Sequence, residues 1–189
     1  ADLNSLGLRP SIETTVHASL AHRVVVHVHC VETISWAVRA DAEAMLGPRL
    51  ARFSWAFIPY RRPGLPLAKE IRLRIKADTD VLVLGNHGLV VAGDSVGEAE
   101  QLLREVVKAL VRPARSAPPA DLAALGKLSE GSPYELARDP AIHALALDEV
   151  SLAQARKGTL YPDHIVFLGA GIAVARPGEN PRAAAERVG

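Results

Sequence analysis

Two histidines separated by a single residue, His27 and His29, are the side chains of this sequence best placed to do chemistry. The segment around them, Val24-Val25-Val26-His27-Val28-His29, has the β-branched residues typical of a buried strand. Side chains two residues apart in a strand share one face and lie about 6.6 Å apart along it, a spacing from which two imidazoles can bind one metal ion. Burying two imidazoles without polar partners costs about 1–3 kcal/mol each, and a shared metal ion removes that cost. The pair indicates a metal site, and ordinary hydrogen-bonded histidines are the alternative.

Two further residues extend this candidate site. His87 stands in Gly85-Asn86-His87-Gly88, where the neighbouring glycines let the backbone approach another group closely. Three neutral imidazoles with an open fourth position form the ligand set of a catalytic zinc site. Glu13 precedes the histidine strand, and its carboxylate either stabilises the first turn of a helix or reaches the metal. His17, one turn further along, is expected to be a hydrogen-bonding neighbour and not a ligand.

The pattern of apolar residues predicts the elements that position these side chains. Strands are expected over 24–28, 53–59, 81–84 and 89–92, the last two joined as a hairpin around His87. A helix is expected over 12–21 with Ser11 as the N-cap, and another over 32–46 that ends at Gly47-Pro48. A third is expected over 67–77, where a strand over 71–75 is the alternative. A fourth is expected over 96–110, and a capping box of Ser95 and Glu98 begins it.

The second part of the chain begins with a proline-rich linker over 113–119. Two or three helices through about Arg156 and late strands over 165–168 and 172–175 are expected to follow. The alternation of strands and helices predicts an α/β layered fold. We expect a single domain over 1–189. Its N-terminal part is expected to be missing, because the sequence opens at Ala1 without an initiator Met.

Composition excludes several classes of function. The 22 basic and 21 acidic side chains give a net charge of +1, so neither a nucleic-acid-binding surface nor a membrane-binding surface is predicted. The single cysteine, Cys30, excludes an internal disulfide and fits a reducing compartment. No apolar run approaches the roughly 18 residues that cross a bilayer. A soluble, cytoplasmic protein is expected.

The ordered set of Pro10-Ser11-Ile12-Glu13, His17, His27-Val28-His29 and the segment from Gly85 to Ser95 resembles the class II aldolase/adducin family. This family includes the fuculose- and rhamnulose-phosphate aldolases and ribulose-phosphate epimerases. The resemblance implies an α/β/α three-layer sandwich with a largely antiparallel central sheet, and a homotetramer. It also implies that His27, His29 and His87 hold zinc or another divalent cation and that Glu13 is the catalytic acid/base group.

The activity that this resemblance implies is a metal-dependent aldolase, a lyase of carbohydrate metabolism that cleaves a carbon–carbon bond in a small ketose (a sugar phosphate) or a hydroxy-acid. A Lewis-acid metal stabilises the enediolate that such cleavage produces. An epimerase or decarboxylase of the same family, or a non-catalytic adducin-like interaction domain, is the alternative. The family's phosphate-binding segments have no counterpart here, so the resemblance leaves the substrate open. Tyr60 and Tyr161 are candidate proton donors, and Arg61-Arg62 is a candidate anion site or an exposed loop pair.

Overall fold

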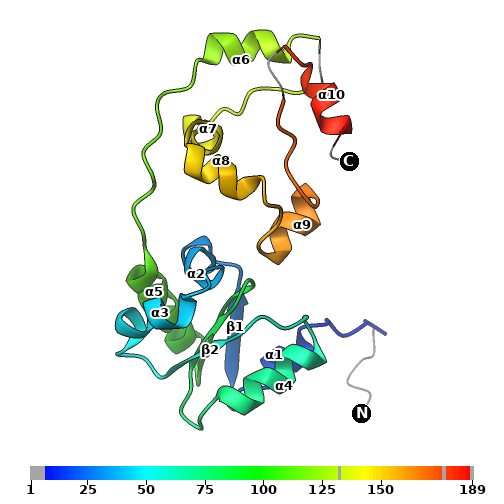
Figure 1. Cartoon of the computed structure of the whole chain (residues 1–189). Helices are drawn as coiled ribbons and strands as arrows, with labels where there is room; N and C mark the ends of the chain where they lie inside the picture. Colours follow the sequence, from blue (N-terminus) through cyan, green and yellow to red (C-terminus); the bar gives the residue numbers. More distant parts are fainter. Residues whose placement is uncertain (1–6, 132, 176–177, 188–189) are drawn as a thin grey trace. The chain divides into compact units, whose positions relative to one another are not determined.

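The computed structural model describes residues 7–131, 133–175 and 178–187 (Figure 1). The chain divides into two compact units, Ala1–Arg112 and Pro113–Gly189. The predicted linker over 113–119 has no helix or strand and lies at the start of the second unit. No helix in the described part of the chain has the length and apolar character needed to cross a membrane.

The first unit is built on a four-stranded sheet with the order β1-β4-β3-β2. Its strands are β1 (Val24–Val28), β2 (Trp55–Ile58), β3 (Val81–Leu84) and β4 (Gly88–Gly93). The β1–β4 and β3–β4 pairs are antiparallel and the β2–β3 pair is parallel, which confirms a largely antiparallel sheet. The predicted hairpin forms between β3 and β4, with His87 in its turn.

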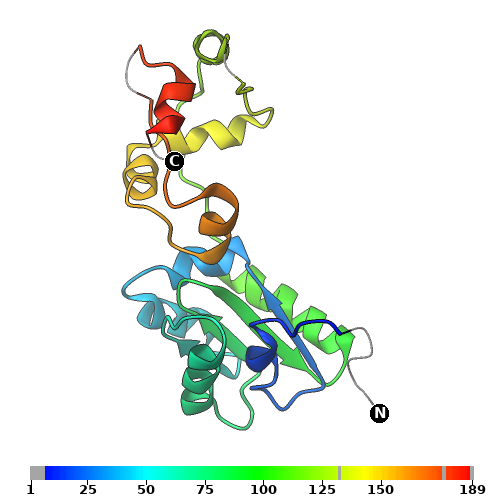
Figure 2. The same cartoon turned by 90° about the vertical axis from the view of Figure 1, so that its right-hand side faces the viewer.

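Helices cover both faces of this sheet. Figure 2 views the first unit from the side of α1 (Thr14–His17) and α4 (Leu65–Arg74), with α2 (Val31–Ala37), α3 (Ala42–Leu50) and α5 (Val96–Leu110) on the other side. Alternation along the central strands fills the two cores: Val81 and Val83 pack with α2, α3 and α5, whereas Leu82 and Leu84 pack with α1 and α4. The α/β/α three-layer arrangement is therefore confirmed.

The two central strands are completely buried, and β1 is not. Every residue of β3 and β4 is buried, which explains their nearly continuous runs of Val and Leu. β1 lies at an edge of the sheet, and all five of its residues are partly exposed. The sequence prediction of a buried strand was therefore correct in its bounds and wrong in its burial. An edge position leaves room for side chains of β1 to serve a site.

The helices of the first unit differ from the prediction in two places. The expected helix over 12–21 is limited to α1, and Ser11 does not cap it: its Oγ accepts a hydrogen bond from the Glu13 backbone N–H at 3.2 Å. The expected helix over 32–46 is two helices, α2 and α3, and the second contains Pro48 near its C-terminal end. The helix expected over 67–77, with a strand over 71–75 as the alternative, is present as α4, which ends at Arg74, so residues 75–77 are neither helix nor strand. The capping box of Ser95 and Glu98 begins α5 as predicted.

The regular structure of the second unit, among its described residues, is all helical: α6 (Leu122–Ser129), α7 (Pro140–Leu147), α8 (Glu149–Ala155), α9 (Pro162–Leu168) and α10 (Pro181–Glu186). Two or three helices were predicted through about Arg156, and three are present there, α6, α7 and α8. The strand predicted over 165–168 is wrong, because these residues complete α9, and 172–175 has no regular structure. A single domain over the whole chain stays a prediction.

Candidate metal centre

Four side chains of the first unit meet at the end of the sheet where β1 and the β3–β4 hairpin lie together. One ligand atom from each of Glu13, His27, His29 and His87 lies within 4.8 Å of all the others. Glu13 is the residue before α1, His27 belongs to β1, His29 follows that strand, and His87 lies in the turn before β4. The antiparallel pairing of β1 with β4 brings His27 and His29 beside His87, and Glu13, 74 residues before His87, reaches the same place from the start of α1.

The three imidazole rings form a nearly equilateral triangle. The ring centres of His27 and His29 are 5.0 Å apart, those of His27 and His87 are 5.0 Å apart, and those of His29 and His87 are 5.1 Å apart. These distances agree with the prediction that the rings of His27 and His29 lie on one face of the sheet with the ring of His87 beside them.

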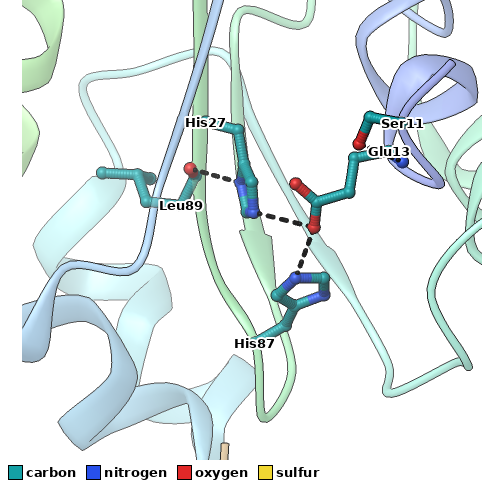
Figure 3. A network of polar contacts seen from close by, with 5 residues as sticks. All are labelled: Ser11, Glu13, His27, His87 and Leu89. Carbon is teal, nitrogen blue, oxygen red and sulfur yellow. Dashed lines mark hydrogen bonds and ion pairs between the residues drawn. The ribbon is translucent and has the colours of Figure 1, made fainter. Parts of the chain in front are cut away.

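The ring of His27 is oriented by the neighbouring strand. Its Nδ1 lies 3.1 Å from the Leu89 carbonyl oxygen (Figure 3). Because a carbonyl only accepts, Nδ1 donates the proton and Nε2 carries the lone pair that faces the cluster. Burial, followed by smaller effects of His87 and His29, lowers the pKa of His27 to about 4, against the opposing effect of the Glu13 carboxylate. His27 is therefore neutral at pH 7, which is the form that binds a metal.

Glu13 joins two of the histidines. His87 Nε2 donates a hydrogen bond to Glu13 Oε1 at 3.0 Å, and His27 Nε2 lies 3.5 Å from the same oxygen (Figure 3). The side chains of His27 and His87 are 5% and 3% exposed, whereas that of Glu13 is 28% exposed. The imidazoles of His27 and His87 are thus the buried side of the cluster, and the carboxylate of Glu13 is its more exposed side.

Backbone hydrogen bonds hold His87 in its turn from three directions. The Gly85 N–H donates to the Ile58 carbonyl at the end of β2, and the Asn86 N–H donates to the Ala37 carbonyl at the end of α2. The His87 N–H closes the turn on the Leu84 carbonyl. Asn86 has a φ of 54°, a left-handed conformation that Asn adopts more easily than most residues.

The cluster fits a divalent cation. Three neutral imidazoles and a carboxylate are the donors that zinc prefers, and donors around a tetrahedral zinc ion lie about 3.4 Å from one another. The 4.8 Å limit in the cluster needs only a small closure to reach that separation. His27 Nε2 is buried and has no hydrogen-bond partner among the described residues, so its lone pair is available to a metal.

Three other residues discussed in the sequence analysis, His17, Cys30 and Arg61, make contacts outside the cluster. His17 Nδ1 donates to the Val25 carbonyl at 3.2 Å and lies outside the cluster, as predicted. The Cys30 thiol donates to a carboxylate oxygen of Glu32. Arg61 forms an ion pair at 2.9 Å with Glu70, whose carboxylate also pairs with Arg74 at 2.7 Å.

Neither candidate tyrosine is joined to the four residues in the described contacts. Tyr60 follows β2, and its side chain is exposed. Tyr161 belongs to the second unit, where it is the N-cap residue of α9 and its ring centre lies 5.8 Å from that of His164, with the two rings tilted by 53°. Both assignments stay predictions.

Two contributors were not identified as such from the sequence. The Leu89 carbonyl orients the ring of His27. Every residue has a backbone carbonyl, so the residue type at 89 does not indicate this contact, which follows from the pairing of Val28 with Leu89 in the sheet. Gly88 was noted for its freedom to approach other groups, and the structure identifies these as the rings of His27 and His29.

The chain is similar to one curated protein and to two solved structures. Over 110 residues, 51% of this chain, the sequence is 30% identical to the "Uncharacterized oxidoreductase YuxG" of Bacillus subtilis strain 168, and it covers 16% of that protein. Two solved structures are similar. The N-terminal class II aldolase domain of a conserved protein from Thermoplasma acidophilum has 32% identity and a TM-score of 0.49, over 53% of this chain and 46% of that one. An aldolase II superfamily protein from Pseudomonas syringae has 23% identity and a TM-score of 0.41, over 75% and 53%.

The chain thus spans a small part of its curated relative and about half of the two structures. The family model for the class II aldolase and adducin N-terminal domain matches residues 2–111, which include the sheet, the hairpin and all four residues of the cluster. Because this match covers more than half of the sequence, the chain belongs to the class II aldolase and adducin family.

Proposed function

We propose that this protein is a metal-dependent lyase that cleaves a carbon–carbon bond in a small ketose, such as a sugar phosphate, or in a hydroxy-acid. His27, His29 and His87 hold zinc or another divalent cation, and Glu13 is the acid/base group. The observation that carries this proposal is the meeting of three imidazoles and one carboxylate within 4.8 Å in a member of this family.

The division of burial in the cluster fits this division of roles. When bound, the cation supplies a Lewis acid that stabilises negative charge as it develops on substrate oxygens. Of Glu13, His27 and His87, only Glu13 has an exposed fraction large enough to meet a substrate, and its carboxylate can take or return a proton at carbon. The Leu89 carbonyl holds the Nδ1 proton of His27, so that Nε2 stays unprotonated.

An epimerase or decarboxylase would use the same four residues, because both reactions also place negative charge on substrate oxygens. The products distinguish these reactions from an aldolase. An adducin-like interaction domain has no need of a carboxylate held 3.0 Å from a buried imidazole, so the cluster favours an enzyme.

Glu13→Gln tests the role of the carboxylate. The full-length protein is assayed for its metal content and for turnover of ketose phosphates and unphosphorylated hydroxy-ketones, with aldehyde release, epimer formation and CO₂ release as separate readouts. We expect the variant to keep about one equivalent of metal and to lose at least about 100-fold in turnover, since general acid–base catalysis contributes about 10²–10⁴-fold.

Glu43→Gln is the matched control, because the same chemical change falls on an exposed residue of α3 outside the cluster. Full turnover in Glu13→Gln would remove Glu13 from the mechanism. A well-folded wild-type protein without affinity for divalent metals would overturn the whole proposal. A homotetramer, which light scattering measures, and a cytoplasmic location stay predictions.

A further inference from the structure

The sheet position beside the histidine rings is occupied by a residue without a side chain. Gly88 is the first residue of β4, and the β1–β4 register, which pairs Val28 with Leu89 and His27 with Val90, continues to place Gly88 opposite His29. Side chains at 88 and 90 share a face of the sheet, so a side chain at 88 would lie on the face that carries both rings.

The space above Gly88 is filled by the ligand residues themselves. A Cβ atom built on Gly88 would lie 3.1 Å from Cδ2 of His29 and 3.2 Å from Cε1 of His27. It would also lie 2.5 Å from the Val28 carbonyl oxygen, a separation that real Cβ atoms do not adopt. The backbone of Gly88 has no positive φ, so the conformation of this residue does not require glycine. The space does.

We propose that Gly88 is a positioning residue for the metal centre, an inference that rests on the proposed function. The absence of a side chain at this position lets the rings of His27 and His29 lean over β4 to within 5.0 Å of each other and about as close to His87. A methyl group at 88 pushes both rings and the end of β1 away, and His87, which is bonded to Gly88, is displaced with them.

The test is Gly88→Ala in the full-length protein. Zinc affinity is measured by competition with a chromophoric chelator, and cobalt(II) is used as a spectroscopic probe, because its visible absorption depends on the number and arrangement of donors. We expect zinc affinity to fall by about 10–100-fold, the range found when groups that orient metal ligands are changed. We also expect a changed cobalt(II) spectrum at saturation, which a merely less stable protein would not show.

Gly97→Ala is the matched control. Gly97 lies in α5, and nothing lies within 4 Å of the Cβ position there, so affinity and spectrum should be those of the wild type. Wild-type affinity and spectrum in Gly88→Ala would overturn the positioning role and leave the proposed function intact. A wild-type protein that binds neither zinc nor cobalt(II) would overturn both.

A second variant covers the case in which Gly88→Ala does not fold. His29→Ala removes one of the two rings that the new methyl group meets. If the methyl group displaces the rings, Gly88→Ala is tolerated better once the ring of His29 is gone. The double variant should then fold, or Gly88→Ala should lower Tm less in the His29→Ala protein than in the wild type. An equal loss in both backgrounds would show that the Val28 backbone is the whole obstacle and would overturn the assignment to the ligand rings.

Discussion

The burial of His27 has a consequence for stability that can be measured without any substrate. In the unfolded chain His27 has its ordinary pKa of 6.5, and in the folded chain burial lowers this pKa to about 4. Between these values the unfolded state binds more protons than the folded state, so acid favours unfolding. The free energy of unfolding of the metal-free protein should therefore fall as the pH is lowered from 6.5 to 4. His27 contributes no pH dependence above 6.5.

The size of the effect follows from the two pKa values. The fall from 6.5 to about 4 corresponds to about 3 kcal/mol, at about 1.36 kcal/mol for each pH unit. This is a large part of the total stability of an ordinary domain, which is about 5–15 kcal/mol.

The two tryptophans make a selective assay possible. Trp36 and Trp55 both lie in the first unit, in α2 and β2, so their fluorescence reports unfolding of the unit that contains the site. Urea unfolding of the full-length protein is measured in chelator at several values between pH 4 and 7.5. His27→Gln removes the titrating group and should flatten the profile, whereas His143→Gln, a change in α7 of the second unit, should keep it. Equal pH profiles for the wild type and His27→Gln would refute this reasoning.

Three other outcomes are expected from the same structure. Zinc at about 100 times its Kd should raise the free energy of unfolding of the wild type by about 2.7 kcal/mol, as measured by urea unfolding with and without metal. A chelator should reverse this gain in stability, and His87→Ala should not show it. Leu82→Ala should lower the free energy of unfolding by about 2–5 kcal/mol, because Leu82 is completely buried in the core under α1 and α4; a smaller loss in urea unfolding would contradict that packing. Ser95→Ala should lose about 1 kcal/mol, seen as a lower urea midpoint, since the Ser95 hydroxyl accepts from the Glu98 N–H at the start of α5.

Signals that act over a few residues were enough to predict much of the first unit. The β-branched run of β1, the turn residues of the hairpin and the capping box of α5 each fix a local structure through strand alternation, turn geometry or a side-chain hydrogen bond. The same alternation placed His27 and His29 on one face. These elements needed no knowledge of distant parts of the chain.

The errors arose where a short signal had two meanings. The apolar run over 165–168 is too short for its period to distinguish a strand from a turn of helix. Pro162 at the start of α9 and Gly169 after its end, with a φ of 83°, are the signals that favour a helix there. Gly47-Pro48 was interpreted as a stop, yet α3 continues through it to Leu50, which is completely buried in the core. Packing of that last turn outweighs the hydrogen bond that the proline cannot donate.

Predicting which histidines could be ligands differs from predicting how they are held. His27 is oriented by a carbonyl of β4, His87 is fixed by carbonyls at the ends of β2 and α2, and Glu13 reaches the cluster from before α1. Each of these contacts depends on the order of strands in the sheet, since only the β1-β4-β3-β2 order places the turn after β3 beside the end of β1. The rigid imidazoles thus owe their positions to the sheet, whereas the carboxylate comes from a short helical turn at its surface. Under the proposed function, Glu13 moves a proton while the cation stays fixed, and a carboxylate on a short surface turn can serve that role without moving the imidazoles held by the sheet.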